Sequence, residues 1–251
     1  YTYCPLWDQN HGNIVGSNIL NILIILGVTA LITNVAIQKT TFKYEIPYML
    51  LITAVLLVMG MTGNEITFIE GVILWILFIA YLLYLYILAK KGNDSSDEQS
   101  VKLYPVWKCL LFIVLGGVCV VIGSQFVVNG ATTIARACGM SERFIGLTIV
   151  AFGTSLPELV TSVSAARKGN AGIAIGNIVG SNIFNILFVV GTVALICPVP
   201  FESRFVIDTV VAILCGVLLW GGTIRHKELR KPCGVVMLLC YAAYFVYLAA
   251  M

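Results

Sequence analysis

The stretch GNIVGSNIFNILFVVGTVALI, residues 176–196, decides the fold of this chain because it occurs twice. The other copy, GNIVGSNILNILIILGVTALI, spans residues 12–32, and 15 of the 21 positions are identical at an offset of 164 residues. Each copy is apolar and long enough to cross a membrane as a helix, which takes about 20 residues. The repeat predicts two related halves, each containing one such helix.

Apolar stretches of similar length continue along the chain. Hydrophobic residues make up 59% of its 251 residues and charged residues 11%, whereas soluble domains carry about 25% charged residues. We predict eight spans: 12–32, 46–63, 66–89, 105–128, 143–167, 172–196, 204–222 and 232–250. KKGNDSSDEQSVK (90–102) is the clearly solvated linker between them. The predicted fold is therefore an all-α protein embedded in a lipid bilayer.

Basic residues are distributed unevenly over the connections between these spans. Threading eight spans places 12 Lys and Arg residues on one side and 3 on the other, which accounts for all 15. The richer side is predicted to be cytoplasmic, which puts the central linker inside and the C-terminus outside the plasma membrane. The first repeat copy then crosses from outside to inside and the second from inside to outside. Such inverted repeats build secondary transporters.

A carboxylate lies in the middle of a predicted span, in AFGTSLPE (151–158). Glu158 at bilayer depth costs about 2.5–3.5 kcal/mol on insertion scales. No Lys or Arg lies inside a predicted helix to pair with Glu158. Its alternative role is a structural carboxylate, protonated or paired.

The helix around Glu158 is predicted to break. Pro157 lacks a backbone N–H and Gly153 loosens the backbone before it. Thr154 and Ser155 add hydroxyl groups beside the break. Carboxylate, hydroxyl and freed carbonyl oxygens are ligands for a hard cation, so we predict a cation site.

Both repeat copies carry a polar stripe. Residues four apart share a helix face, which groups Asn177, Ser181 and Asn185 in one copy and Asn13, Ser17 and Asn21 in the other. Helix packing is the alternative explanation, because the pairs Gly12/Gly16 and Gly176/Gly180 form GxxxG motifs. We expect these glycines to pack closely and to bring the polar stripe up to Glu158.

The sequence lacks the residue patterns that nucleic-acid-binding proteins and hydrolytic enzymes require. No basic run interleaved with aromatic residues suggests a nucleic acid partner. Ser155 is outside a GxSxG motif, and the histidines, His11 and His226, lie at predicted membrane surfaces, so we expect no enzyme. The eight cysteines show no CxxC spacing and are expected to act as small apolar residues rather than metal ligands or disulfides. No resident cofactor is expected, and the sequence leaves the oligomeric state open.

The segments GLTIVAFGTSLPELVTS (146–162) and GNIVGSNIFNIL (176–187) together resemble the second α-repeat of the sodium/calcium exchanger membrane domain. This domain belongs to the calcium/cation antiporter superfamily, and the bacterial branch is the most similar, which implies a bacterial inner membrane. The resemblance covers residues 12–251 and implies ten helices in two inverted halves of five. It implies exchange of Ca²⁺ for Na⁺, with K⁺ or H⁺ coupling in some members.

The resemblance also implies a set of cation ligands. In the second half these are Glu158, Thr154, Ser155, the backbone carbonyl of Ala151, Ser181 and Asn185, and in the first half Ser17 and Asn21. Some relatives carry Asp at the position of Asn185. Asn removes one charge there, so the counter-ion and the stoichiometry stay open.

The chain departs from the family pattern at its beginning. Subtracting 164 from positions 153–158 places the first-half acidic motif before residue 1. We expect an atypical segment 1–11, an incomplete first repeat of three helices (12–89), a cytoplasmic linker (90–104) and a complete second repeat of five helices (105–251). Such a chain is expected not to exchange ions alone. The alternatives are a Na⁺/H⁺ or K⁺-coupled exchanger that does not carry Ca²⁺, a channel and a non-transporting membrane protein.

Overall fold

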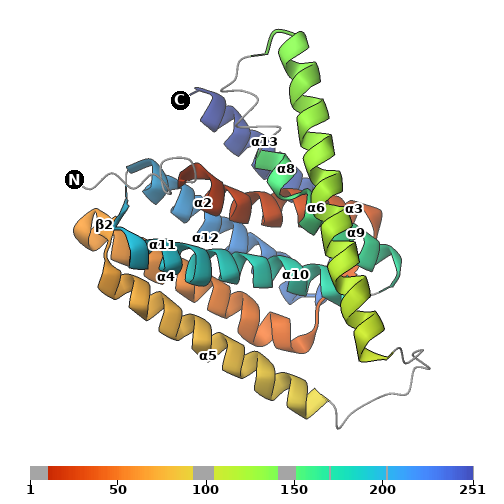
Figure 1. Cartoon of the computed structure of the whole chain (residues 1–251), viewed down its shortest axis with the longest axis horizontal. Coiled ribbons are helices and arrows are strands. Elements are labelled where there is room, and N and C mark those ends of the chain that lie inside the picture. The colour runs from red at the N-terminus through yellow and green to blue at the C-terminus, as the bar shows by residue number, and fades with distance from the viewer. Residues whose placement is uncertain (1–10, 93–104, 141–150, 170, 202, 251) are drawn as a thin grey trace. The chain divides into compact units, whose positions relative to one another are not determined.

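The structure is a computed structural model that describes residues 11–92, 105–140, 151–169, 171–201 and 203–250 (Figure 1). Its elements before the linker are α2 (His11–Leu20), the π-helix η1 (Asn21–Leu26), α3 (Gly27–Ile32), β1 (Val35–Ala36), the π-helix η2 (Thr41–Glu45), α4 (Ile46–Gly63), β2 (Glu65–Ile66) and α5 (Phe68–Gly92). The elements after it are α6 (Val106–Ala137), α8 (Ala151–Thr154), α9 (Leu156–Arg167), α10 (Ala171–Phe184), the π-helix η4 (Asn185–Val190), α11 (Gly191–Ile196), β3 (Val199–Pro200), α12 (Ser203–Ile224), β4 (Glu228–Leu229) and α13 (Lys231–Ala250).

Seven helical runs within the described residues are long and apolar enough to cross a membrane. They are Ile14–Ile32, Thr41–Gly63, Phe68–Lys90, Val106–Ala137, Gly172–Ile196, Phe205–Ile224 and Lys231–Leu248. The predicted all-α membrane fold is therefore confirmed. The fifth predicted span, 143–167, is interrupted at Ser155, inside the stretch where a helix break is predicted. Its first eight residues lie outside the described part.

The described chain divides into two compact units. One comprises the residues up to Trp75 together with those from Thr154 onward, and the other comprises Ile76–Gly153. The first unit contains both repeat copies. Its core is the run α2–η1, where Ile19, Leu23, Ile25 and Leu26 are each at most 1% exposed. Within this unit, α12 lies beside α2 and α4, and α10 packs against α9 (Figure 1).

The sequence repeat is also a repeat of structure. The π-helices η1 and η4 begin at Asn21 and Asn185, 164 residues apart, and α3 and α11 follow them at the same offset. Near the ends of α4 and α12, Asn64 and Lys227 both adopt positive φ angles, 54° and 51°. The four short strands pair in a matching way, β1 with β4 and β2 with β3, both antiparallel.

These strand pairs join connections that the charge distribution assigns to the same side of the membrane. The pair β1–β4 joins the connection after α3 to the one after α12, and both carry basic residues. The pair β2–β3 joins the connection after α4 to the one after α11 on the opposite side. The pairing therefore agrees with the predicted threading.

Close helix packing in the first unit relies on glycines outside the two GxxxG motifs. A Cβ added at Gly234 of α13 would lie 2.8 Å from the backbone oxygen of Gly27, and one added at Gly71 of α5 would lie 3.0 Å from that of Gly191. Gly27 and Gly191 occupy equivalent positions in the two copies. Small residues that let backbones approach are typical of membrane helix interfaces. A close glycine contact from another helix is thus made at the equivalent glycine of each repeat copy.

Two polar features differ from expectation. Cys197, directly after α11, is disulfide-bonded, so the expectation that the cysteines are all apolar and unbonded is wrong there. Its connection is predicted to lie outside the cell, where disulfides persist. Asp208 lies near the start of the predicted span 204–222, where a solvated carboxylate is the usual expectation, but it is half-buried in α12 and accepts a hydrogen bond of 2.8 Å from the Tyr244 hydroxyl of α13.

Candidate cation site

The site begins at a break between two helices of very different length. Ser155 (φ −99°, ψ 4°) ends α8 and precedes α9, and Pro157 lies in the first turn of α9. Because Pro157 has no N–H, it cannot continue the hydrogen-bond ladder of α8 into α9. The ladder resumes when the Leu159 N–H donates to the Ser155 oxygen at 3.1 Å. The predicted break is therefore present, and it places Glu158 in the first turn of α9.

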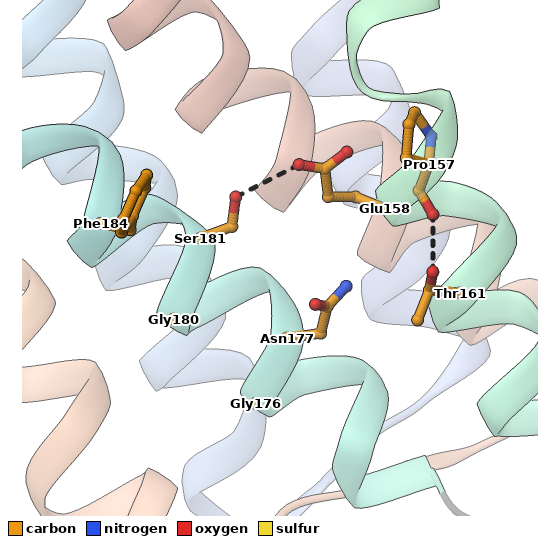
Figure 2. Close-up of a pocket in the computed structure, with 8 residues that line it drawn as sticks. All are labelled: Pro157, Glu158, Thr161, Gly176, Asn177, Gly180, Ser181 and Phe184. Atoms are coloured by element: carbon orange, nitrogen blue, oxygen red, sulfur yellow. Dashed lines mark hydrogen bonds between the residues drawn. The ribbon is translucent and has the colours of Figure 1, made fainter. Parts of the chain in front are cut away.

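Glu158 faces a pocket of about 480 Å³ between α9 and α10 (Figure 2). The pocket is lined by Pro157, Glu158, Thr161, Gly176, Asn177, Gly180, Ser181 and Phe184. Across it, the Ser181 hydroxyl donates to Oε1 of Glu158 at 3.4 Å. Glu158 is half-buried and forms no ion pair with a described basic residue. Elsewhere in the described chain, Arg230 pairs with Glu228. The structure therefore leaves the carboxylate charge open to a mobile cation.

Two hydrogen bonds involve residues that line the pocket, one within α9 and one between α9 and α10. On α9, the Thr161 hydroxyl donates to the Pro157 backbone oxygen at 2.8 Å (Figure 2). Between the walls, Nδ2 of Asn177 donates to Oγ of fully buried Ser162 at 3.5 Å. The Asn177 carbonyl end is therefore turned away from Ser162, toward the pocket that Asn177 lines.

The two repeat copies meet beside this pocket. Nδ2 of Asn185 donates to Oγ of Ser17 at 3.4 Å and to Oδ1 of Asn18 at 2.9 Å. Nδ2 of Asn21 donates to Oδ1 of Asn182 at 3.0 Å. The structure thus brings Ser17 and Asn185 into contact and bonds Asn21 to the opposite copy through Asn182; Ser17, Asn21 and Asn185 are predicted ligands from opposite halves. The helix α9, which carries Glu158, packs against η1, which begins at Asn21.

The remaining predicted ligands lie at the helix break. Ser155 is 3% exposed. Ala151 and Thr154 lie in α8, but their side-chain surroundings are outside the described part of the structure. Gly153 is needed for packing, because a Cβ there would overlap the Val128 side chain of α6.

The predicted packing role of the GxxxG glycines is wrong for three of them. A Cβ added at Gly16, Gly176 or Gly180 would meet no atom within 4 Å. Gly176 and Gly180 line the pocket instead, so their missing side chains leave open space facing Glu158. Gly12 lies in α2, and its surroundings are outside the described part.

Sequence reasoning missed two central residues, Asn18 and Asn182. Both lie near the four-residue stripes but off them and were not predicted as ligands, yet they are 3% and 1% exposed and bond to each other's backbone. The available signal was an Asn at the same position of an apolar stretch in both copies, because an amide inside a membrane helix requires hydrogen-bond partners.

The donor set suits a hard cation. Among the described residues, no group of three or more His, Cys, Asp or Glu side chains could hold a metal ion. One carboxylate surrounded by hydroxyl and amide oxygens matches the all-oxygen coordination of Ca²⁺ and similar ions. Transition metals prefer imidazole or thiolate ligands, which this pocket lacks among its lining residues.

Comparison with known proteins agrees with this geometry. A family profile described as "Sodium/calcium exchanger protein" matches residues 10–87 and 108–250. The putative antiporter CaxA of Alkalimonas amylolytica is 36% identical over 247 residues, which cover 94% of this chain and 77% of that protein. The sodium/calcium exchanger MaX1 of Methanosarcina acetivorans is 31% identical over 277 residues, covering 94% and 79%.

The fold is also similar to solved structures. A structure of the sodium–calcium exchanger NCX_Mj, soaked with zero Na⁺ and Ca²⁺, superimposes with a TM-score of 0.77 at 32% identity. The match covers 94% of this chain and 75% of that one. With its repeated helices, its broken helix and these matches over most of its length, this chain belongs to the sodium/calcium exchanger protein family.

Proposed function

We propose that this chain acts in secondary antiport of cations, binding Ca²⁺ and Na⁺ in turn at the Glu158 pocket. The observation that carries the proposal is the half-buried Glu158 carboxylate, which faces Ser181 across the pocket and has no described basic partner. A carboxylate at this depth is costly and marks an ion pathway by default.

Electrostatics favours a cation in this pocket. Two unit charges 4 Å apart attract by about 4 kcal/mol at an effective dielectric constant of 20, and a divalent ion doubles this. The Ser181 hydroxyl at 3.4 Å is a long hydrogen bond for an O–H donor. A cation bound between Ser181 and Glu158 would replace this hydrogen bond. It would be coordinated by the carboxylate and by the lone pairs of the Ser181 oxygen.

The ligands we propose are drawn from both repeat copies. Glu158 supplies the charge, and Ser181, Asn185, Ser17 and Asn21 supply neutral oxygens. Three residues at the helix break complete the proposed set: Ser155, Thr154 and the carbonyl of Ala151.

Exchange follows from sharing this single charge. Na⁺ and Ca²⁺ both need the negative charge of Glu158. Because the pocket offers one carboxylate, the two ions compete for it and do not occupy it together. A carrier that reorients only when a cation covers the carboxylate then couples the two fluxes without ATP. The inverted repeat supplies the two related faces that alternating access needs, and the relatives named as exchangers support the same activity.

Transport and binding together test the proposal. The chain is reconstituted in proteoliposomes, and Ca²⁺ uptake is measured under an imposed Na⁺ gradient, with K⁺ and H⁺ gradients as separate arms. Ca²⁺ binding in detergent is measured by calorimetry, because binding reports on the site independently of turnover. Glu158→Gln keeps the shape of the side chain and removes its charge, so binding should be lost.

Glu228→Gln is the matched control, because Glu228 is half-buried like Glu158 but lies on β4 and is paired with Arg230. Binding should survive this change. Equal Ca²⁺ binding by Glu158→Gln and the unmodified chain would refute the proposed site. Uptake driven by a K⁺ or H⁺ gradient but not by a Na⁺ gradient would show that the counter-ion is K⁺ or H⁺ rather than Na⁺.

A further inference from the structure

Asn18 and Asn182 form a reciprocal pair where the two repeat copies cross. Nδ2 of Asn182 donates to the backbone oxygen of Asn18 at 3.2 Å, and Nδ2 of Asn18 donates to that of Asn182 at 3.4 Å. The two residues are 164 positions apart, so each is the other's counterpart in the repeat. Both are buried, at 3% and 1% exposure.

These two bonds fix the orientation of both amides. A backbone carbonyl can only accept a hydrogen bond, so each side chain must turn its nitrogen toward the opposite backbone. The Oδ1 atoms then point the other way. Oδ1 of Asn182 accepts from Nδ2 of Asn21 at 3.0 Å, and Oδ1 of Asn18 accepts from Nδ2 of Asn185 at 2.9 Å.

The orientation passes on to Asn21 and Asn185. Because Asn21 presents its nitrogen to Asn182, its Oδ1 faces the other direction. That oxygen is buried and has no hydrogen-bond partner among the described residues, in a side chain that is 1% exposed. A buried acceptor without a partner is unfavourable, and such an atom calls for an explanation such as an ion.

Asn185 is held in the corresponding way. Its nitrogen donates to both Asn18 and Ser17, which commits Nδ2 and turns Oδ1 away from both. Asn185 lies on the same helical run as Ser181, which contacts Glu158. Asn21 begins η1, against which the Glu158 helix α9 packs. Both amide oxygens therefore belong to helices that border the carboxylate.

We propose that Asn18 and Asn182 are positioning residues that hold Asn21 and Asn185 with their oxygens, rather than their nitrogens, toward the bound cation. This inference rests on the proposed function. A flipped amide would present N–H groups, which carry partial positive charge and cannot coordinate a cation. The pair thus determines whether two neutral side chains attract or repel the ion.

Removing one member of the pair tests this role. Asn182→Ala removes the acceptor that fixes Asn21, so the half-saturating Ca²⁺ concentration in calorimetry should rise by about tenfold, the effect of losing one well-placed ligand. Thr53→Val is the control, because it removes a buried hydroxyl whose bond of 2.7 Å stays within α4. That variant should bind Ca²⁺ like the unmodified chain.

Rescue separates orientation from general damage. Asp has two equivalent oxygens and presents one in either orientation, so Asn21→Asp should restore Ca²⁺ binding in the Asn182→Ala background. Asn185→Asp adds the same charge but contacts Asn18, so it should rescue Asn182→Ala much less. In the Asn18→Ala background the expectation is reversed. Asn185→Asp should restore Ca²⁺ binding, and Asn21→Asp should restore it much less.

Each outcome decides the proposal. Specific rescue in both backgrounds supports positioning, whereas equal rescue by both Asp variants, or unchanged binding by Asn182→Ala, overturns it. Asn182→Ser and Asn18→Ser serve if the Ala variants do not fold, with the same rescue pattern expected. Glu158→Gln is measured in parallel: if it binds Ca²⁺ normally, the proposed cation site fails, whatever the Asn variants show.

Discussion

Enlarging Gly180 should close the pocket while leaving the fold intact. A Cβ at Gly180 meets no atom within 4 Å, and Gly180 lines the pocket next to Ser181. The pocket of about 480 Å³ has room for on the order of ten waters, since each occupies about 30 Å³ in the liquid. A methyl group takes little of this space, whereas an isobutyl group projects into it.

The expected magnitudes separate stability from binding. Replacing a helical glycine by Ala or Leu should stabilise the fold by about 0.5–1 kcal/mol. Gly180→Ala should leave the half-saturating Ca²⁺ concentration within about twofold, and Gly180→Leu should raise it by at least about tenfold, or about 1.4 kcal/mol. Calorimetry measures Ca²⁺ binding, and SDS titration in mixed micelles measures the free energy of unfolding.

Gly221→Leu is the matched control, because Gly221 is exposed on α12 and has equal space around it. It should bind Ca²⁺ normally. Normal binding by a stably folded Gly180→Leu variant would show that the cation does not use this pocket, and the reasoning from the pocket to the function would be wrong.

Two further predictions concern stability. Gly234→Ala places a Cβ 2.8 Å from the Gly27 oxygen, so its free energy of unfolding should be about 1–3 kcal/mol lower than that of the uncrowded control Gly221→Ala; equal values in SDS titration would contradict the glycine contact. Tyr244→Phe removes the 2.8 Å hydrogen bond to half-buried Asp208 and should lower the free energy of unfolding by about 1–3 kcal/mol without changing Ca²⁺ binding. A loss of binding in Tyr244→Phe would instead tie Asp208 to the cation pathway.

The sequence was sufficient for the parts of the site that depend on local chemistry. The helix break follows from Pro157, which removes a donor wherever it occurs in a helix. The meeting of Ser17 with Asn185 follows from the repeat, because the same polar positions occur in two helices that need partners in the membrane. The burial of Glu158 follows from the apolar residues on both sides of it.

Tertiary features account for what the sequence did not reveal. The π-helices that begin at Asn21 and Asn185 are one such feature, because the four-residue spacing of the polar stripes gives no sign of them. Asn18 and Asn182 became central because the two copies cross between them, and no spacing within one helix predicts the crossing point. The bond of Asp208 to Tyr244, 36 residues later, likewise depends on which helices become neighbours.

The same limit explains the glycines. A GxxxG motif predicts close packing only if another helix reaches that face. Gly27 and Gly234 meet such a neighbour in each other, whereas Gly176 and Gly180 face open space beside Glu158. Identical small residues therefore serve packing in one place and pocket volume in another.

The repeat copies are symmetric in their amides and asymmetric in their charge. Asn18 and Asn182 bond reciprocally, and Asn21 and Asn185 donate to them in equivalent ways. The serines differ, because Ser181 donates to Glu158 whereas its counterpart Ser17 donates to the backbone oxygen of Ile14 at 2.8 Å. Neutral amides can connect two helices inside a membrane at low electrostatic cost, since most of their donors and acceptors pair with one another and the Asn21 Oδ1 is the exception among the described residues. A carboxylate cannot be satisfied in this way and needs a counter-charge. The amide network therefore explains how the copies hold together without ions, and Glu158 explains why an ion should bind beside them.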